Sequence, residues 1–227
     1  MGLLQFFFQE GAANADTVST AKLTFLDLAM KGGFVMAIIV LLSLVAAYIF
    51  IERFVVIKRA TKHDQNFMNR IKDYIHEGKL DAAIALCKST DTPTARMVEK
   101  GISRLGRPLA DISTAIENVG KLEVSKLEKS FPTLATIAAA EPMLGFLGTV
   151  IGMIQSFYAM SLAGNNIEVS LLSNGIYTSL VTTAGGLIVG ILCNFGYNTL
   201  VVRVEKVVFN LEATLTEFMD ILNEPAK

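Results

Sequence analysis

Three long runs without a charged residue limit the structures that this chain can adopt. They cover residues 33–51, 142–166 and 169–202. A helix of about 20 mostly apolar residues crosses the roughly 30 Å hydrocarbon core of a bilayer. Backbone polar groups inside lipid must be satisfied within a helix or a closed barrel. Because the chain is also 52% hydrophobic and only 18% charged, we predict an all-α membrane protein with three transmembrane helices and membrane lipid around them.

The positions of Lys and Arg predict how the three helices are oriented. Residues 58–130 hold 14 of the 20 Lys and Arg, whereas the link between the second and third runs holds none. Basic residues that flank membrane helices remain on the cytoplasmic side. We therefore expect a multi-pass protein with a periplasmic N-terminus and a cytoplasmic C-terminus.

The region between the first two runs has the pattern of helical hairpins. Its apolar residues recur at helical spacing, with breaks at Gly78, at Thr92-Pro93 and at 106–108. One long helix, kinked at most at Gly120 or Pro132, is expected from residue 109 into the second span. An apolar stripe after the third span predicts a helix that packs on this region.

The expected segments are a periplasmic N-terminal segment with an interfacial helix (1–32), transmembrane helix 1 (33–57), a cytoplasmic helical domain (58–130), transmembrane helix 2 (131–163), a periplasmic loop (164–169), transmembrane helix 3 (170–202) and a cytoplasmic C-terminal helix (203–227).

Small and hydroxyl-bearing residues form one stripe along the second span and another along the third. Small residues let helices approach closely, and hydroxyls can form hydrogen bonds between helices. Two interpretations follow, which are packing within a helical bundle and a polar pathway through the membrane. We assign helix packing to Pro142, Gly145, Gly148, Gly152, Gly186 and Gly190, and the pore lining or proton pathway to Thr149, Thr183, Ser179 and Ser156.

Few ionisable residues lie close to the spans. Glu141 is either an interfacial charge at the cytoplasmic end of the second span or, since residues 130–140 are also uncharged, a buried carboxylate that faces a pore. Glu52 and Arg53 follow the first run directly and are expected as interfacial charges at its cytoplasmic end.

Other chemistry has little support in the sequence. No Gly-x-x-x-x-Gly-Lys-Ser/Thr motif for ATP is present, and His63 and His76 lack metal-ligand spacing. The two cysteines do not suggest a disulfide framework or metal cluster. A net charge of −1 produces no basic field for nucleic acid. We therefore expect no enzyme activity, cofactor, metal site or nucleic-acid partner.

Two motifs carry a resemblance to a known family. The segment EPMLGFLGTVIGM at 141–153, followed by Gln155, Ser156 and Phe157, resembles the second-span signature of the MotA/TolQ/ExbB proton channel family. The segment TTAGGL at 182–187, preceded by Gly175-Ile176, is similar to its third-span motif. Glu52-Arg53 resembles the pair that closes the first span. Three spans make the chain more similar to ExbB and TolQ than to the four-span MotA.

The resemblance implies a homopentamer in the bacterial inner (cytoplasmic) membrane. Its second and third helices would line a pore around two copies of an ExbD/TolR-like single-span partner, which supplies an aspartate. Thr149 and Thr183 match the family's pore threonines, whereas Thr178 stands where ExbB proteins often carry a glutamate. Proton motive force would energise TonB-dependent outer-membrane transport through a TonB/TolA-like protein. A TolQ-like motor for envelope maintenance is the alternative, followed by a stand-alone membrane scaffold or transporter.

Overall fold

The computed structural model describes residues 32–61, 66–163 and 169–223, and all its regular elements in these ranges are helices. The predicted all-α class is therefore confirmed for this part of the chain. The predicted interfacial helix and the link at 164–168 lie outside the described residues. The helices are α3 (Gly33–Ala60), α4 (Phe67–His76), α5 (Leu80–Thr90), α6 (Pro93–Ile102), α7 (Leu109–Glu128), α8 (Phe131–Ala163) and α9 (Val169–Asn223).

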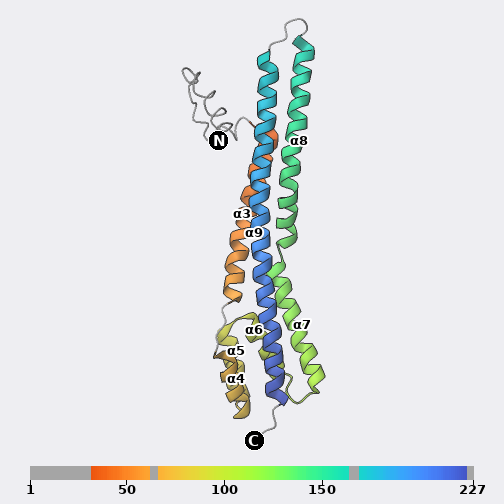
Figure 1. Cartoon of the computed structure of the whole chain (residues 1–227). Helices are drawn as coiled ribbons and strands as arrows, with labels where there is room; N and C mark the ends of the chain where they lie inside the picture. The colour runs from red at the N-terminus through yellow and green to blue at the C-terminus, as the bar shows by residue number, and fades with distance from the viewer. Residues whose placement is uncertain (1–31, 62–65, 164–168, 224–227) are drawn as a thin grey trace, which may run out of the picture.

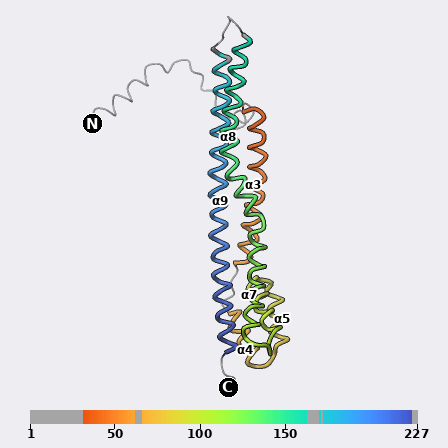
Figure 2. Tube along the Cα trace, turned by 90° about the vertical axis from the view of Figure 1, so that its right-hand side faces the viewer, coloured from red at the N-terminus to blue at the C-terminus, as the bar shows by residue number. Residues whose placement is uncertain are grey.

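The molecule is a long rod with an apolar half and a polar half. In the apolar half α3, α8 and α9 run alongside one another, and α9 continues through the polar half, where α4 to α7 gather around it (Figures 1 and 2). Three helical stretches are long and apolar enough to cross a membrane, namely Gly33–Ala60, Leu109–Leu162 and Leu172–Asn223. Large apolar side chains such as Phe34, Phe146 and Phe195 are exposed on these stretches. The three predicted spans are thus present, with apolar surfaces suited to lipid or to neighbouring subunits.

The short helices of the polar half end at the breaks that the sequence predicts. Gly78 and Gly106 have φ angles of 70° and 91°, which glycine adopts without a steric penalty. Thr92 caps the start of α6, because its hydroxyl accepts a hydrogen bond from the backbone N–H of Ala95 at 3.2 Å. Pro93 occupies the first turn, where a missing N–H costs no helical hydrogen bond.

The long helix expected from residue 109 into the second span is divided into two helices next to Pro132, one of the two positions where a kink was expected. Helix α7 ends at Glu128 and α8 begins at Phe131. Pro132 accounts for the interruption, since it has no N–H to donate to the carbonyl of residue 128 and its ring crowds that carbonyl. Pro142, in contrast, lies inside α8 without ending it.

The main hydrophobic core lies in the polar half and extends into the lower part of the spans. Ile71, Val98, Ile116, Leu211 and Phe218 come from four different helices and are almost completely buried. The C-terminal part of α9 therefore packs its apolar stripe on α6 and α7. This packing holds the base of the membrane helices in one arrangement.

Candidate functional site in the membrane helices

Helices α8 and α9 meet along a seam whose side chains differ before and after Glu141 of α8. One buried stripe of α8 carries large side chains before Glu141 and small ones after it. Its members are Phe131, Leu134, Ile137, Glu141, Gly145, Gly148, Gly152 and Ser156. A Cβ atom on Gly186 of α9 would lie 2.6 Å from the carbonyl oxygen of Glu141. A Cβ atom on Gly145 would lie 3.2 Å from the Cα atom of Thr183. The backbones of α8 and α9 therefore touch beyond Glu141.

Two serines of the seam fit into positions opposite glycines. The hydroxyl of Ser179 occupies the space that a Cβ atom on Gly152 would need, and the hydroxyl of Ser156 does the same at Gly175. Ser156 donates to the carbonyl of Gly152 at 2.8 Å, and Ser179 donates to that of Gly175 at 2.7 Å. Both predicted pathway serines are thus buried between α8 and α9 of a single chain.

The two predicted pathway threonines have different surroundings. Thr183 donates a hydrogen bond across the seam to the carbonyl oxygen of Gly145 at 2.9 Å. Thr149 donates to the carbonyl oxygen of Phe146 in its own helix at 2.6 Å. Thr149 also borders a shallow outward-facing groove of about 460 Å³ with Val150, Met153, Ile154 and Phe157. That Thr149 and Thr183 line a pore stays a prediction about an assembly.

Thr182 belongs to the seam although the sequence analysis did not select it. Its hydroxyl lies 3.2 Å from the carbonyl oxygen of Gly32 and 2.8 Å from that of Thr178, and it can donate to either. It thereby connects α9 to the start of α3. The available signal was its spacing, because residues 179, 182 and 186 fall on one helical face.

Glu141 is the only charged residue in the sequence of α8, and its side chain is 0% exposed. Neither carboxyl oxygen has a hydrogen-bond partner among the residues that the structure describes. Pro142 follows it, and a Cβ atom on Gly190 would lie 2.7 Å from the proline ring. Both residues therefore lie in the contact with α9, and whether Glu141 also faces a pore stays a prediction.

Glu52 and Arg53 lie near the end of α3 that joins the polar half. Arg53 is almost buried, pairs with Glu52 and donates to the carbonyl oxygen of Lys126 at 3.1 Å. The last carbonyls of a helix lack partners within it, so Arg53 supplies a donor to the end of α7. The guanidinium of Arg203 lies 4.3 Å from the ring centroid of Phe54, which adds a contact between α3 and α9.

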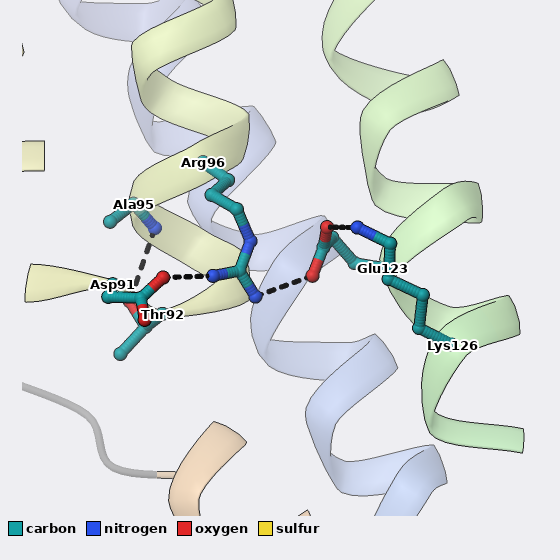
Figure 3. Close-up of polar contacts among 6 residues, drawn as sticks. All are labelled: Asp91, Thr92, Ala95, Arg96, Glu123 and Lys126. Atoms are coloured by element: carbon teal, nitrogen blue, oxygen red, sulfur yellow. Dashed lines mark hydrogen bonds and ion pairs between the residues drawn. The ribbon is translucent and has the colours of Figure 1, made fainter. Parts of the chain in front are cut away.

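A charged network ties the short helices to α7 (Figure 3). Arg96 donates to Asp91 at 2.5 Å and to Glu123 at 2.6 Å, and Lys126 donates to Glu123 at 2.7 Å. Burial by itself would raise the pKa of Glu123, whose side chain is only 5% exposed, but the hydrogen bonds and charges of Arg96 and Lys126 outweigh burial and lower that pKa. This network lies before α8, outside the expected span 131–163.

Within the described ranges, no three His, Cys, Asp or Glu side chains are grouped so that they could hold a metal ion. Cys87 and Cys193 are both free thiols. Cys87 is buried in the polar half, and burial raises the pKa of its thiol to about 12. Its side chain therefore serves as a small apolar residue of the core.

Comparison with known proteins places these features in a family. The family model described as the MotA/TolQ/ExbB proton channel family matches residues 89–213. The Tol-Pal system protein TolQ of Haemophilus influenzae is 28% identical over 222 residues, which cover 91% of this chain and 97% of that protein.

Several other relatives carry ExbB names. A putative biopolymer transport protein ExbB homolog of Methanothermobacter thermautotrophicus is 24% identical over 190 residues, 83% of this chain and 67% of that protein. The biopolymer transport protein ExbB of Aquifex aeolicus is 37% identical over 111 residues, 47% of this chain and 73% of that protein. The matched region contains α8 and most of α9 with the whole seam between them. The chain therefore belongs to the MotA/TolQ/ExbB proton channel family.

Proposed function

We propose that this chain is the proton-channel and stator subunit of a motor in the bacterial inner membrane. With an ExbD/TolR-like partner, it uses proton motive force to energise TonB-dependent transport across the outer membrane. The observation that carries the proposal is the α8–α9 seam, where hydroxyl side chains and glycines of both family motifs meet in the membrane half. The polar half, with most of the Lys and Arg, then lies in the cytoplasm.

The assembly that we propose is a homopentamer around a partner dimer. The outer face of α8 is suited to contact a partner helix. It exposes the apolar side chains of Met143, Phe146, Ile154 and Phe157 beside the groove at Thr149. The small number of acidic residues in the membrane helices supports the idea that a second chain contributes to the proton pathway. Residues 131–163 and 169–202 contain a single acidic residue, Glu141, and α9 covers it. A mobile carboxylate that carries the proton and forms hydrogen bonds with Thr149 and Thr183 would thus come from the ExbD/TolR-like chain.

A TolQ-like role in envelope maintenance is the second candidate. It is favoured by the match to TolQ of Haemophilus influenzae over 97% of that protein's length. In that case the partner chain is TolR-like and the output passes through a TolA-like protein.

The test is co-expression of the chain with a short single-span protein that carries a membrane aspartate, followed by purification in mild detergent. Native mass spectrometry should show five copies of this chain with two of the partner. Deletion of the gene should abolish uptake that requires proton motive force at the outer membrane, while an uncoupler should do the same in the wild type.

The outcomes separate the two candidates. Loss of envelope integrity with normal TonB-dependent uptake after deletion supports the TolQ-like role. A functional monomer, or no effect of the deletion on either process, contradicts the motor proposal.

A further inference from the structure

Glu141 is buried on the stripe of α8 that faces α9. On this stripe it stands between Ile137 and Gly145, with large side chains before it and glycines in close contact with α9 after it. The backbone of α9 passes directly over it, as the 2.6 Å approach of a Cβ atom on Gly186 to its carbonyl oxygen shows. Its side chain is 0% exposed, and both carboxyl oxygens lack a donor among the described residues.

No countercharge faces this carboxyl from the helices packed against it. The sequence has no Asp, Glu, Lys, Arg or His in 33–51 of α3 or in 169–202 of α9, and Glu141 is the only one in 131–163 of α8. The thiol of Cys193 in α9 lies close enough to this carboxyl for the two groups to interact electrostatically. An ionised carboxylate without a partner in such surroundings costs far more free energy than the neutral acid. The geometry of the closed seam therefore favours a carboxyl group that keeps its proton.

Other polar atoms that can form hydrogen bonds with water or with a proton-carrying group lie in the same seam. Pro142 has no N–H, so the carbonyl of Ala138 receives no helical hydrogen bond from that position. This carbonyl oxygen would be 3.4 Å from a Cβ atom on Gly190, which places it in the α8–α9 contact. Beyond Glu141, the hydroxyls of Thr183, Ser179 and Ser156 follow at successive levels, and each donates to a backbone carbonyl while its oxygen can still accept.

We propose that Glu141 is a proton-binding site of this subunit, neutral while α8 and α9 pack as in this structure and able to release its proton when the seam opens. In the release step the carboxyl O–H bond breaks and the proton passes to a water molecule or to a carboxylate of the partner chain. The negative charge stays on Glu141 and keeps the seam hydrated until a proton returns. The release step rests on the proposed function, whereas the neutral state in the closed seam does not.

Infrared spectroscopy tests the neutral state without any need for motor activity. The full chain in lipid at pH 7 is compared with Glu141→Gln, which has the shape of the neutral acid. The difference spectrum should contain the C=O stretch of a protonated carboxylic acid, and deuterium should shift this band if water reaches the seam. Glu205→Gln, which changes an exposed glutamate of α9 beyond the expected span, should remove only carboxylate bands. A difference spectrum with only carboxylate bands for Glu141 overturns the proposal.

A functional comparison tests the release step. Glu141→Gln should keep the thermal stability and the partner co-purification of the wild type but lower proton-driven work by roughly 100-fold, the lower range for loss of a proton-transfer group. Glu141→Asp, which retains a titratable carboxyl, should restore part of this work. Equal work by the wild type and Glu141→Gln overturns the release step. If the acid band is present but the wild type drives no work with either kind of partner, the proposed function fails and the proton-binding site stands.

Discussion

Thr183 of α9 donates a hydrogen bond to the carbonyl oxygen of Gly145 in α8, 2.9 Å away. The two residues are 38 positions apart in the chain, and this bond joins the two family motifs. The hydroxyl of Thr149 instead donates to the carbonyl oxygen of Phe146 in its own helix. The two threonines therefore provide a matched pair for substitution.

The first prediction compares Thr183→Val with Thr149→Val. Valine keeps the shape of threonine and removes its hydroxyl, and hydrogen bonds between membrane helices are worth about 0.6 kcal/mol on average. Thr183→Val should lower the free energy of unfolding by about that amount, whereas Thr149→Val should leave it almost unchanged. In the proposed motor both variants should retain the partner and lose proton-driven work, measured as energised transport beside a Thr178→Val control. Full activity of both would remove these threonines from the mechanism.

The second prediction concerns the closeness of α8 and α9. In Gly186→Ala the added Cβ atom would lie 2.6 Å from the carbonyl oxygen of Glu141 and 2.9 Å from the Cα atom of Gly145, which are backbone atoms that cannot rotate away. The helices must separate, and we expect a loss of roughly 1–3 kcal/mol in the free energy of unfolding.

Gly185→Ala is the matched control for that substitution. Its Cβ atom would meet the Cε atom of Met36 at 2.8 Å, and this flexible side chain can move. Thermal unfolding in detergent, followed by circular dichroism, should show a clear loss for Gly186→Ala and a small change for Gly185→Ala. Equal stability of the two variants would show that α8 and α9 are not in close contact at Gly186.

The third prediction concerns acid stability of the polar half. Because the pKa of Glu123 is lowered in the folded state, its carboxylate contributes stability that is present above the unfolded pKa of about 4.3. This contribution is lost as the pH falls through the lower folded pKa. The melting temperature of the wild type should therefore fall more steeply below about pH 4 than that of Glu123→Gln, with Glu205→Gln as the exposed control. Parallel pH profiles of the wild type and Glu123→Gln would contradict this role.

Arg96→Met gives a separate test of the same network. It removes the hydrogen bond from Arg96 and leaves the buried carboxylate of Glu123 paired with Lys126. Removing one member of a buried ion pair costs about 3–5 kcal/mol, and partial exposure of Arg96 reduces this to roughly 1–3 kcal/mol. Chemical unfolding at pH 7 should show the loss, and it should be smaller in a Glu123→Gln background. Equal losses in both backgrounds would mean that Arg96 stabilises the fold without Glu123.

The fourth prediction tests the orientation in the membrane. In a background with Cys87→Ala and Cys193→Ala, cysteines placed at Lys79 and at Asn165 should react with an impermeant maleimide from opposite sides. Lys79 is exposed in the polar half, so its replacement is accessible to the reagent. Wild-type Cys87 should react slowly even in open membranes, because it is buried and its thiolate is scarce. Labelling of both introduced cysteines from the periplasm would refute the N-out arrangement.

Much of the fold could be predicted from the sequence because the decisive features are local. The length of an uncharged apolar run determines whether a helix can cross a bilayer, and this length is read directly from residues 33–51, 142–166 and 169–202. Gly78, Thr92-Pro93 and Gly106 likewise end helices through their own backbone geometry. The stripe positions of Gly145, Thr183 and Gly186 also follow from helical spacing alone.

Only the tertiary structure decided what these stripes contact. The network of Arg96 and Glu123 joins residues 27 positions apart, and the bond from Thr182 to Gly32 joins residues 150 positions apart. Such contacts depend on the rotation and relative height of packed helices, which a periodic pattern leaves free. Glu141 illustrates the difference most clearly. Its sequence position allowed both an interfacial charge and a buried carboxyl, and the outcome depended on whether the backbone of α9 at Gly186 came close enough to cover it.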